Sequence, residues 1–176
     1  MLFLTGCQNS NKAMDRTVAV REALLSAQGC TFDAIITADY GETLHVFQMN
    51  CQCEADGDMN FTVTYPESIS GITGHVRQDS AGITFDGHVL AFEKLADGYI
   101  SPVSAPWVFL KTLRSGYIRS CSQEDNKISA VIDDSFADDA LQLHISFDEH
   151  DIPTNAEIIW QNRRILSLEI SNYSYL

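Results

Sequence analysis

The sequence lacks any apolar run of about 18 residues, the length that a helix needs to cross a bilayer. It is also poor in basic residues, with 11 Lys and Arg against 24 Asp and Glu, a net charge of −13. Such a charge repels nucleic acid and anionic lipid headgroups. We therefore expect no membrane-spanning helix and exclude DNA and RNA as partners.

Recognisable catalytic motifs are missing as well. There is no His-Glu-x-x-His pair, no Gly-x-Ser-x-Gly elbow and no phosphate-binding loop. No nucleophile has an evident base beside it. We predict a protein that is not an enzyme and uses no cofactor. An enzyme stays open as an alternative only if the fold gathers His45, His75 or His144 beside a carboxylate.

Two segments match part of a metal-binding motif but not all of it. Oxygen-bearing residues follow the offsets of a calcium loop, but its sixth position, which should be glycine, is Phe61. Cys51-Gln52-Cys53 is shorter than the usual zinc or redox spacing. A metal shared between these thiols and Cys30 is conceivable, but a buried thiol or a disulfide fits the pattern better. We predict no metal site.

The segment Leu4-Thr5-Gly6-Cys7 resembles a bacterial lipobox, where a lipoprotein precursor is cut and its cysteine acylated. Only three residues precede it, and none is Lys or Arg, so a signal peptide is incomplete. We expect either that the true start codon lies further upstream or that the sequence was trimmed at this end. The competing interpretation is a chance cysteine in a frayed terminus.

A lipidated Cys7 fixes the expected organisation. Residues 1–11 would be a truncated signal and polar tether, and residues 12–176 a single domain, the usual count for this length. The protein would be anchored by lipid in the bacterial cell envelope, on the outer side of the cytoplasmic membrane or in the periplasm. Four cysteines would then remain in a compartment that permits disulfides.

Periodicity predicts an α+β domain that is mostly antiparallel strands. An amphipathic helix is expected over 11–27, with Met14, Val18, Leu24 and Leu25 on its apolar face. A second helix, over 101–116, is apolar around much of its circumference and should be buried or cover an apolar hollow. Strands are expected over 30–37, 43–51, 60–65, 72–78, 82–85, 88–93, 127–132, 140–147, 156–160 and 164–173.

The first two strands should form a hairpin. A turn centred on Tyr40-Gly41 places Cys30 opposite Cys51 and keeps the apolar residues on one face. Facing residues at a non-hydrogen-bonded position have Cα atoms about 4.5 Å apart, within reach of a disulfide. We predict Cys30 and Cys51 as neighbours and disulfide candidates, with Cys53 as the competing partner.

The order of elements and the stretch from Leu141 to Tyr173 resemble LolA-like and LolB-like lipoprotein-localisation factors and their RseB-type relatives. That stretch holds an alternating strand, an acidic turn at 148–151, Ile152-Pro153 and a final strand over 168–173. The resemblance implies a curved antiparallel sheet, an unclosed half-barrel, whose concave face is covered by helices and can hold acyl chains. The soluble carrier of that family is not lipidated, and none of its functional side chains maps onto this sequence.

Our functional hypothesis is a non-enzymatic envelope lipoprotein whose concave face binds a hydrophobic ligand, an acyl chain or a lipoprotein. The expected ligand-binding residues are Phe32, Ile36, Phe47, Met49, Phe61, Val63, Trp107, Phe109 and Leu110. The alternative is an interaction or sensor module with a packed core, no ligand and another envelope protein as partner. An exposed apolar patch on the 101–116 helix would favour it.

Overall fold

A computed structural model describes residues 6–77, 80–85, 95–96 and 100–176. Its helices are α1 (Gly6–Ser26) and α2 (Ala105–Ser115), the latter preceded by a 3-10 turn over Pro102–Ser104. Its strands are β1 (Gly29–Asp39), β2 (Leu44–Glu54), β3 (Met59–Tyr65), β4 (Thr73–Arg77), β5 (Ser80–Phe85), β6 (Tyr117–Glu124), β7 (Lys127–Asp133), β8 (Gln142–Phe147), β9 (Pro153–Trp160) and β10 (Arg163–Tyr175).

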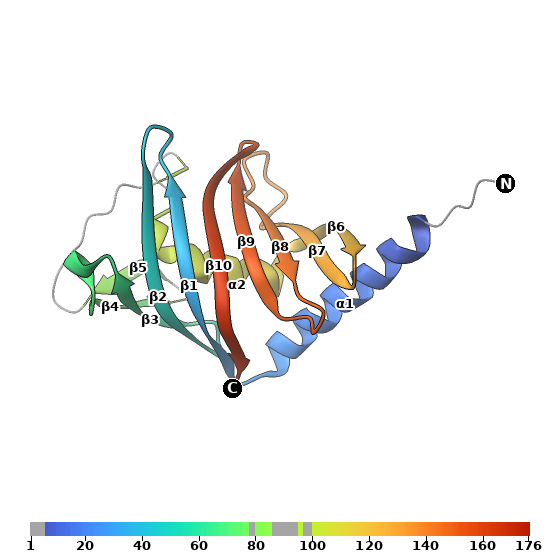
Figure 1. The fold of residues 1–176 in the computed structure, drawn as a ribbon, viewed down its shortest axis with the longest axis horizontal. Coiled ribbons are helices and arrows are strands. Elements are labelled where there is room, and N and C mark those ends of the chain that lie inside the picture. Colours follow the sequence, from blue (N-terminus) through green and yellow to red (C-terminus); the bar gives the residue numbers. More distant parts are fainter. Residues whose placement is uncertain (1–5, 78–79, 86–94, 97–99) are drawn as a thin grey trace.

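The strands form one antiparallel sheet in the order β5-β4-β3-β2-β1-β10-β9-β8-β7-β6. The first and last long strands, β1 and β10, pair at its centre and join the two halves of the chain (Figure 1). Within the described residues the sheet does not close. The predicted fold class, an open antiparallel sheet with an N-terminal and a late helix, is confirmed.

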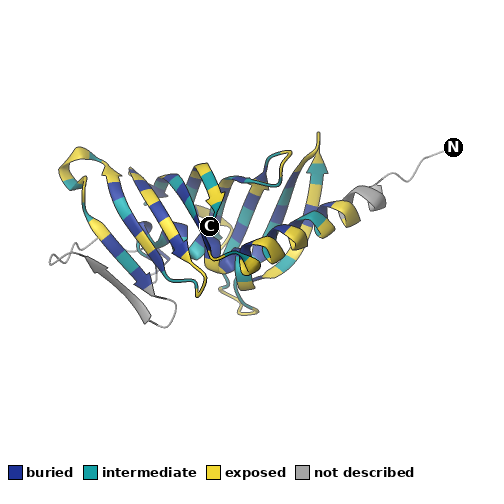
Figure 2. Cartoon of the chain, turned by 90° about the horizontal axis from the view of Figure 1, so that it is seen from below, coloured by how far each residue is buried: buried dark blue, intermediate teal, exposed yellow. Residues whose placement is uncertain are grey.

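Alternation along the strands assigns one face of the sheet to the core (Figure 2). In β8, for example, Leu143, Ile145 and Phe147 are buried while the residues between them are not. Both helices pack on this covered face, α1 against β6 and β7 and α2 against β7 to β10. Burial of apolar area, at about 25 cal/mol per Å², drives this packing.

The N-terminal helix begins earlier and faces differently from our expectation. It starts at Gly6, so the stretch predicted to be a tether is helical. Over residues 11–26 its buried side chains are Ala13, Thr17, Val20 and Leu24, spaced four, three and four residues apart. The predicted face was therefore wrong in part, because Val18 and Leu25 are exposed. A small residue such as Ala13 suits close packing against the sheet better than a bulkier neighbour.

The β1–β2 hairpin has the predicted faces but a different register. Residues Gly41 and Glu42 form the turn, inside a hydrogen bond from Tyr40 N to Thr43 O of 3.0 Å. Gly41 has φ of 95°, a left-handed conformation that glycine adopts without strain. Because the turn lies one residue later than predicted, each partner shifts by two. Cys30 therefore lies opposite Cys53, and the predicted Cys30–Cys51 pairing was wrong.

Strand β6 is absent from our prediction, since only one of its side chains, that of Cys121, is buried. Its hairpin with β7 turns at Asp125-Asn126, both with positive φ, as two-residue hairpin turns require. The expected strand over 88–93, and its hairpin turn at Asp86-Gly87, lie outside the described residues.

Candidate ligand-binding site

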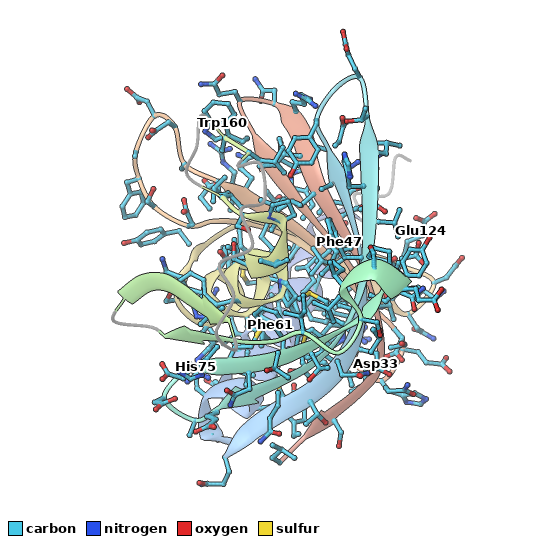
Figure 3. The ribbon with its side chains drawn as sticks, turned by 90° about the vertical axis from the view of Figure 1, so that its left-hand side faces the viewer. Asp33, Phe47, Phe61, His75, Glu124 and Trp160 are labelled. Atoms are coloured by element: carbon cyan, nitrogen blue, oxygen red, sulfur yellow. The ribbon has the colours of Figure 1, made fainter. Side chains whose placement is uncertain are left out.

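The predicted ligand-binding residues belong to the one apolar core on the covered face of the sheet, with Trp107 packed against its side. Eight of the nine are almost fully buried, with exposures from 0% for Ile36 and Phe109 to 6% for Phe47. Phe32 on β1 meets Phe109 on α2 edge to face, with ring centroids 5.9 Å apart. Figure 3 shows Phe47 and Phe61 on the inner side of the strands. The strands and α2 thus bring these residues into one apolar layer.

The packing of this layer is that of a core. Edge-to-face aromatic contact adds about 0.5–1.5 kcal/mol beyond the buried area. Phe61 also lies so close to Gly74 on β4 that a Cβ there would come within 2.2 Å of its ring. Glycine at that position lets the ring lie flat over the neighbouring strand. Side chains that fill their space in this way leave little room for a ligand among them.

One hollow opens at the end of the layer, where β2 ends. It measures about 170 Å³ and lies between α2, the end of α1 and the β2–β3 turn. The side chains and backbone around it belong to Leu25, Cys53, Gly57, Trp107, Leu110, Lys111, Arg114 and Ser115. Trp107 and Leu110 are the two predicted ligand-binding residues that line it.

Polar contacts hold the wall of this hollow in place. The Trp107 indole donates to the carbonyl of Gly57 over 3.2 Å, and Arg114 donates to the carbonyls of Glu54 and Ala55. The Lys111 ammonium lies 5.0 Å from the centre of the Trp107 ring, a cation–π distance. The hollow therefore combines an apolar floor with two cations, in a chain whose net charge is strongly negative.

The size of the hollow limits what it can hold. Drug-sized ligand pockets measure about 300–1,000 Å³, and a dry cavity of about 150 Å³ accepts benzene. A hollow of about 170 Å³ admits the end of an acyl chain or one apolar side chain. Leu25, half exposed at 52%, extends the apolar surface at its mouth.

Two larger, open hollows lie on the opposite, polar face of the sheet, and the sequence did not indicate them. The larger, of about 630 Å³, is crossed by β1 to β4 and by β10. Asp33 accepts hydrogen bonds of 2.6 Å from the amides of Asn50 and Asn172 there. Figure 3 shows Asp33 and His75 on this outer side. The smaller, of about 600 Å³, is lined by serines, His144 and Glu157.

His75 is the histidine that lies beside a carboxylate in the larger polar hollow. Its Nδ1 is 2.8 Å from Asn60 Oδ1, and its Nε2 is 3.3 Å from Asp58 Oδ2. Both ring nitrogens thus face side-chain oxygens at the rim of this hollow.

His45 is exposed at the start of β2, where its ring contacts the Tyr40 ring edge to face. In the part of the chain that the structure describes, no three His, Cys, Asp or Glu side chains are grouped to hold a metal ion. Among those same residues, no helix combines the length and apolar character that crossing a bilayer requires.

Three cysteines gather under the β1–β2 hairpin. Cys30, Cys51 and Cys53 are buried on the covered face as free thiols, and Cys53 also lines the apolar hollow. The Tyr173 hydroxyl, buried without a well-formed hydrogen bond among the described residues, lies near Cys30. Burial raises the pKa of Tyr173 and of Cys51, so both stay protonated at neutral pH.

The chain is similar to several solved structures. No family model and no curated protein matches the sequence. Similar solved structures include a DUF1329 family protein from Desulfovibrio piger, at 8% identity over 95% of this chain and 93% of that chain, with a TM-score of 0.46. A LolA superfamily protein from Nitrosomonas europaea has 10% identity over 92% of each chain and a TM-score of 0.41. MucB has 10% identity over 94% of this chain and 59% of its own, with a TM-score of 0.45.

Proposed function

We propose that this chain is a non-enzymatic binding domain of the bacterial cell envelope, anchored through a lipid on Cys7. Its ligand would be an apolar group, such as the end of an acyl chain, held where the helix–sheet layer opens. The observation that carries the proposal is the hollow lined by Trp107 and Leu110, with Leu25 exposed at its mouth.

The anchor is supported by the sequence Leu4-Thr5-Gly6-Cys7 and by the position of α1. Figure 1 shows the first turns of α1 extending past the edge of the sheet at β6. A helix of 21 residues is about 30 Å long, at 1.5 Å per residue. An anchor at this end would leave the sheet and the apolar hollow clear of the bilayer surface.

The dense layer beneath α2 limits the proposal to one end of the domain. Water penalises exposed apolar surface, so a ligand must either open the layer or bind where it already opens. Opening it would separate Phe109 from Phe32, whereas the hollow beside Trp107 exists without any rearrangement. The ligand therefore meets Trp107 and Leu110, while the other seven predicted residues support the fold.

Two tryptophans make this proposal testable by fluorescence. Trp107 borders the hollow, whereas Trp160 lies at the opposite end of the sheet, beside the β9–β10 turn (Figures 1 and 3). The variant W160F leaves Trp107 as the reporter, and W107F leaves Trp160 as the matched control. A fatty acid brominated at its chain end quenches a tryptophan that it touches.

We expect saturable quenching in W160F and none in W107F at the same concentrations of the brominated fatty acid. Equal quenching of both variants would place the ligand elsewhere or indicate non-specific association. No quenching in either would remove the ligand-binding function and leave the second candidate.

That second candidate is a docking module with a fully packed core, and the burial of eight predicted residues favours it. The exposed residues of α2 are Lys111 and Ser115, so this helix does not present the exposed apolar patch that would favour a docking module. A partner would instead meet the polar face of the sheet or one of its edges. Co-purification of one envelope protein, combined with no quenching in either variant, would establish this function.

A further inference from the structure

The corrected register of the β1–β2 hairpin brings two buried cysteines face to face. Cys30 and Cys53 are directly opposite partners, with exposures of 0% and 1%. The Cα atoms of such partners lie about 4.5–5.5 Å apart. Disulfides span Cα separations of about 4.4–6.8 Å. The backbone therefore already has the spacing that a bond between these residues needs.

The two thiols of this opposite pair interact, and their interaction lowers the pKa of Cys30 and raises that of Cys53. The Cys53 thiol also donates to the Glu54 carbonyl over 3.5 Å. Cys51 lies on the same face but opposite Phe32, two residue pairs further along the ladder. Cys121 is on β6, where its sulfur lies 3.4 Å from the Thr17 hydroxyl of α1. The geometry thus singles out one pair among the four described cysteines.

We propose that Cys30 and Cys53 form a disulfide between β1 and β2 when the chain folds under oxidising conditions, while Cys51 and Cys121 remain thiols. The oxidant is a small or protein disulfide. One cysteine, as thiolate, attacks the oxidant and forms a mixed disulfide, releasing one oxidant thiol. The second cysteine then attacks the mixed disulfide and releases the other. The two thiols lose two protons and two electrons, and the oxidant becomes two thiols.

The timing of the reaction follows from burial. In the folded chain both cysteines are almost fully buried, so a disulfide oxidant has little access to either sulfur. Exchange requires a thiolate that the oxidant can reach. The bond therefore forms while the hairpin assembles, before α2 covers it. It closes the end of the hairpin opposite its turn, where Cys53 borders the apolar hollow.

The test uses the full chain with Cys7→Ser in every sample, so that the proposed lipidation site adds no thiol. The reduced, unfolded protein is refolded in a mixture of reduced and oxidised glutathione, and its free thiols are then alkylated. Peptide mapping by mass spectrometry assigns the linkage. We expect one intramolecular bond, Cys30–Cys53, with Cys51 and Cys121 alkylated. The folded, reduced protein in the same buffer should form the bond many times more slowly.

Single cysteine variants distinguish a bond between Cys30 and Cys53 from one that involves Cys51. C51A removes a buried cysteine of the same hairpin and should keep the bond, whereas C30A and C53A should abolish it. Circular dichroism checks that each variant folds. If a variant does not fold, the peptide map of the refolded parent protein is the test. A Cys30–Cys51 or Cys51–Cys53 linkage would overturn the proposal. So would a refolded protein in which all four cysteines are alkylated.

Discussion

Replacing Phe109 by alanine tests whether the layer beneath α2 is a packed core or a ligand cavity. The Phe109 side chain is fully buried and meets Phe32 edge to face. Truncation of a packed phenylalanine costs about 3–5 kcal/mol, including the cavity that it leaves. A protein of this length changes its Tm by about 2–4 °C per kcal/mol, so we expect a fall of about 6–20 °C.

Urea unfolding of the parent and the variant, followed by circular dichroism, gives the free-energy difference directly. Val108→Ala is the matched control, because Val108 lies on the same helix but is only partly buried, and its truncation should cost much less. If Phe109→Ala costs less than about 1 kcal/mol, the ring is not in a close-packed layer. That result would refute our account of the layer as a packed core and favour a ligand cavity beneath α2.

Three further predictions concern other parts of the chain. In the natural host, Cys7→Ser should abolish incorporation of labelled palmitate and release the protein from membranes; an unlabelled parent protein would contradict the anchor. Reducing the Cys30–Cys53 bond should cost about 3 kcal/mol, since it closes a loop of roughly two dozen residues, and thermal unfolding with and without a reductant measures this; an unchanged Tm would contradict it. Hydrogen bonds from the Gly41 amide and from Arg163 lower the pKa of Asp39. A carboxylate with a lowered pKa stabilises the fold above its unfolded pKa of about 3.9, and that stabilisation is lost as the pH falls through the folded pKa. R163M should raise the pKa of Asp39 in an NMR titration, and an unchanged pKa would count against the contact.

Much of the fold could be predicted because the apolar pattern is strong where the sheet is covered. In β8, the alternation of Leu143, Ile145 and Phe147 marks the core face without reference to any other part of the chain. The same logic predicted the buried residues of β1 and β2, even though the predicted register was off by two. A shift of two residues preserves both faces of a strand and changes only the partners. This is why the core residues were right and the cysteine pair was wrong.

The rest depended on contacts that a single sequence does not show. Strand β6 has one buried side chain, because it lies at the edge of the sheet, and so it carries no alternation. The buried face of α1 uses Ala13 and Thr17, which hydrophobicity alone does not select. The apolar hollow depends on where Trp107 of α2 meets Gly57 of the β2–β3 turn, and these are about 50 residues apart in the chain. The turn sequence Asp125-Asn126 was the available signal for β6.

A crystal structure of the protein with a fatty acid brominated at its chain end would locate the apolar group most directly, through the anomalous signal of bromine. We predict one peak beside Trp107 and Leu110, with Phe32 and Phe109 still in contact. A peak between those two phenylalanine rings, or saturated crystals without any bromine peak, would contradict the account.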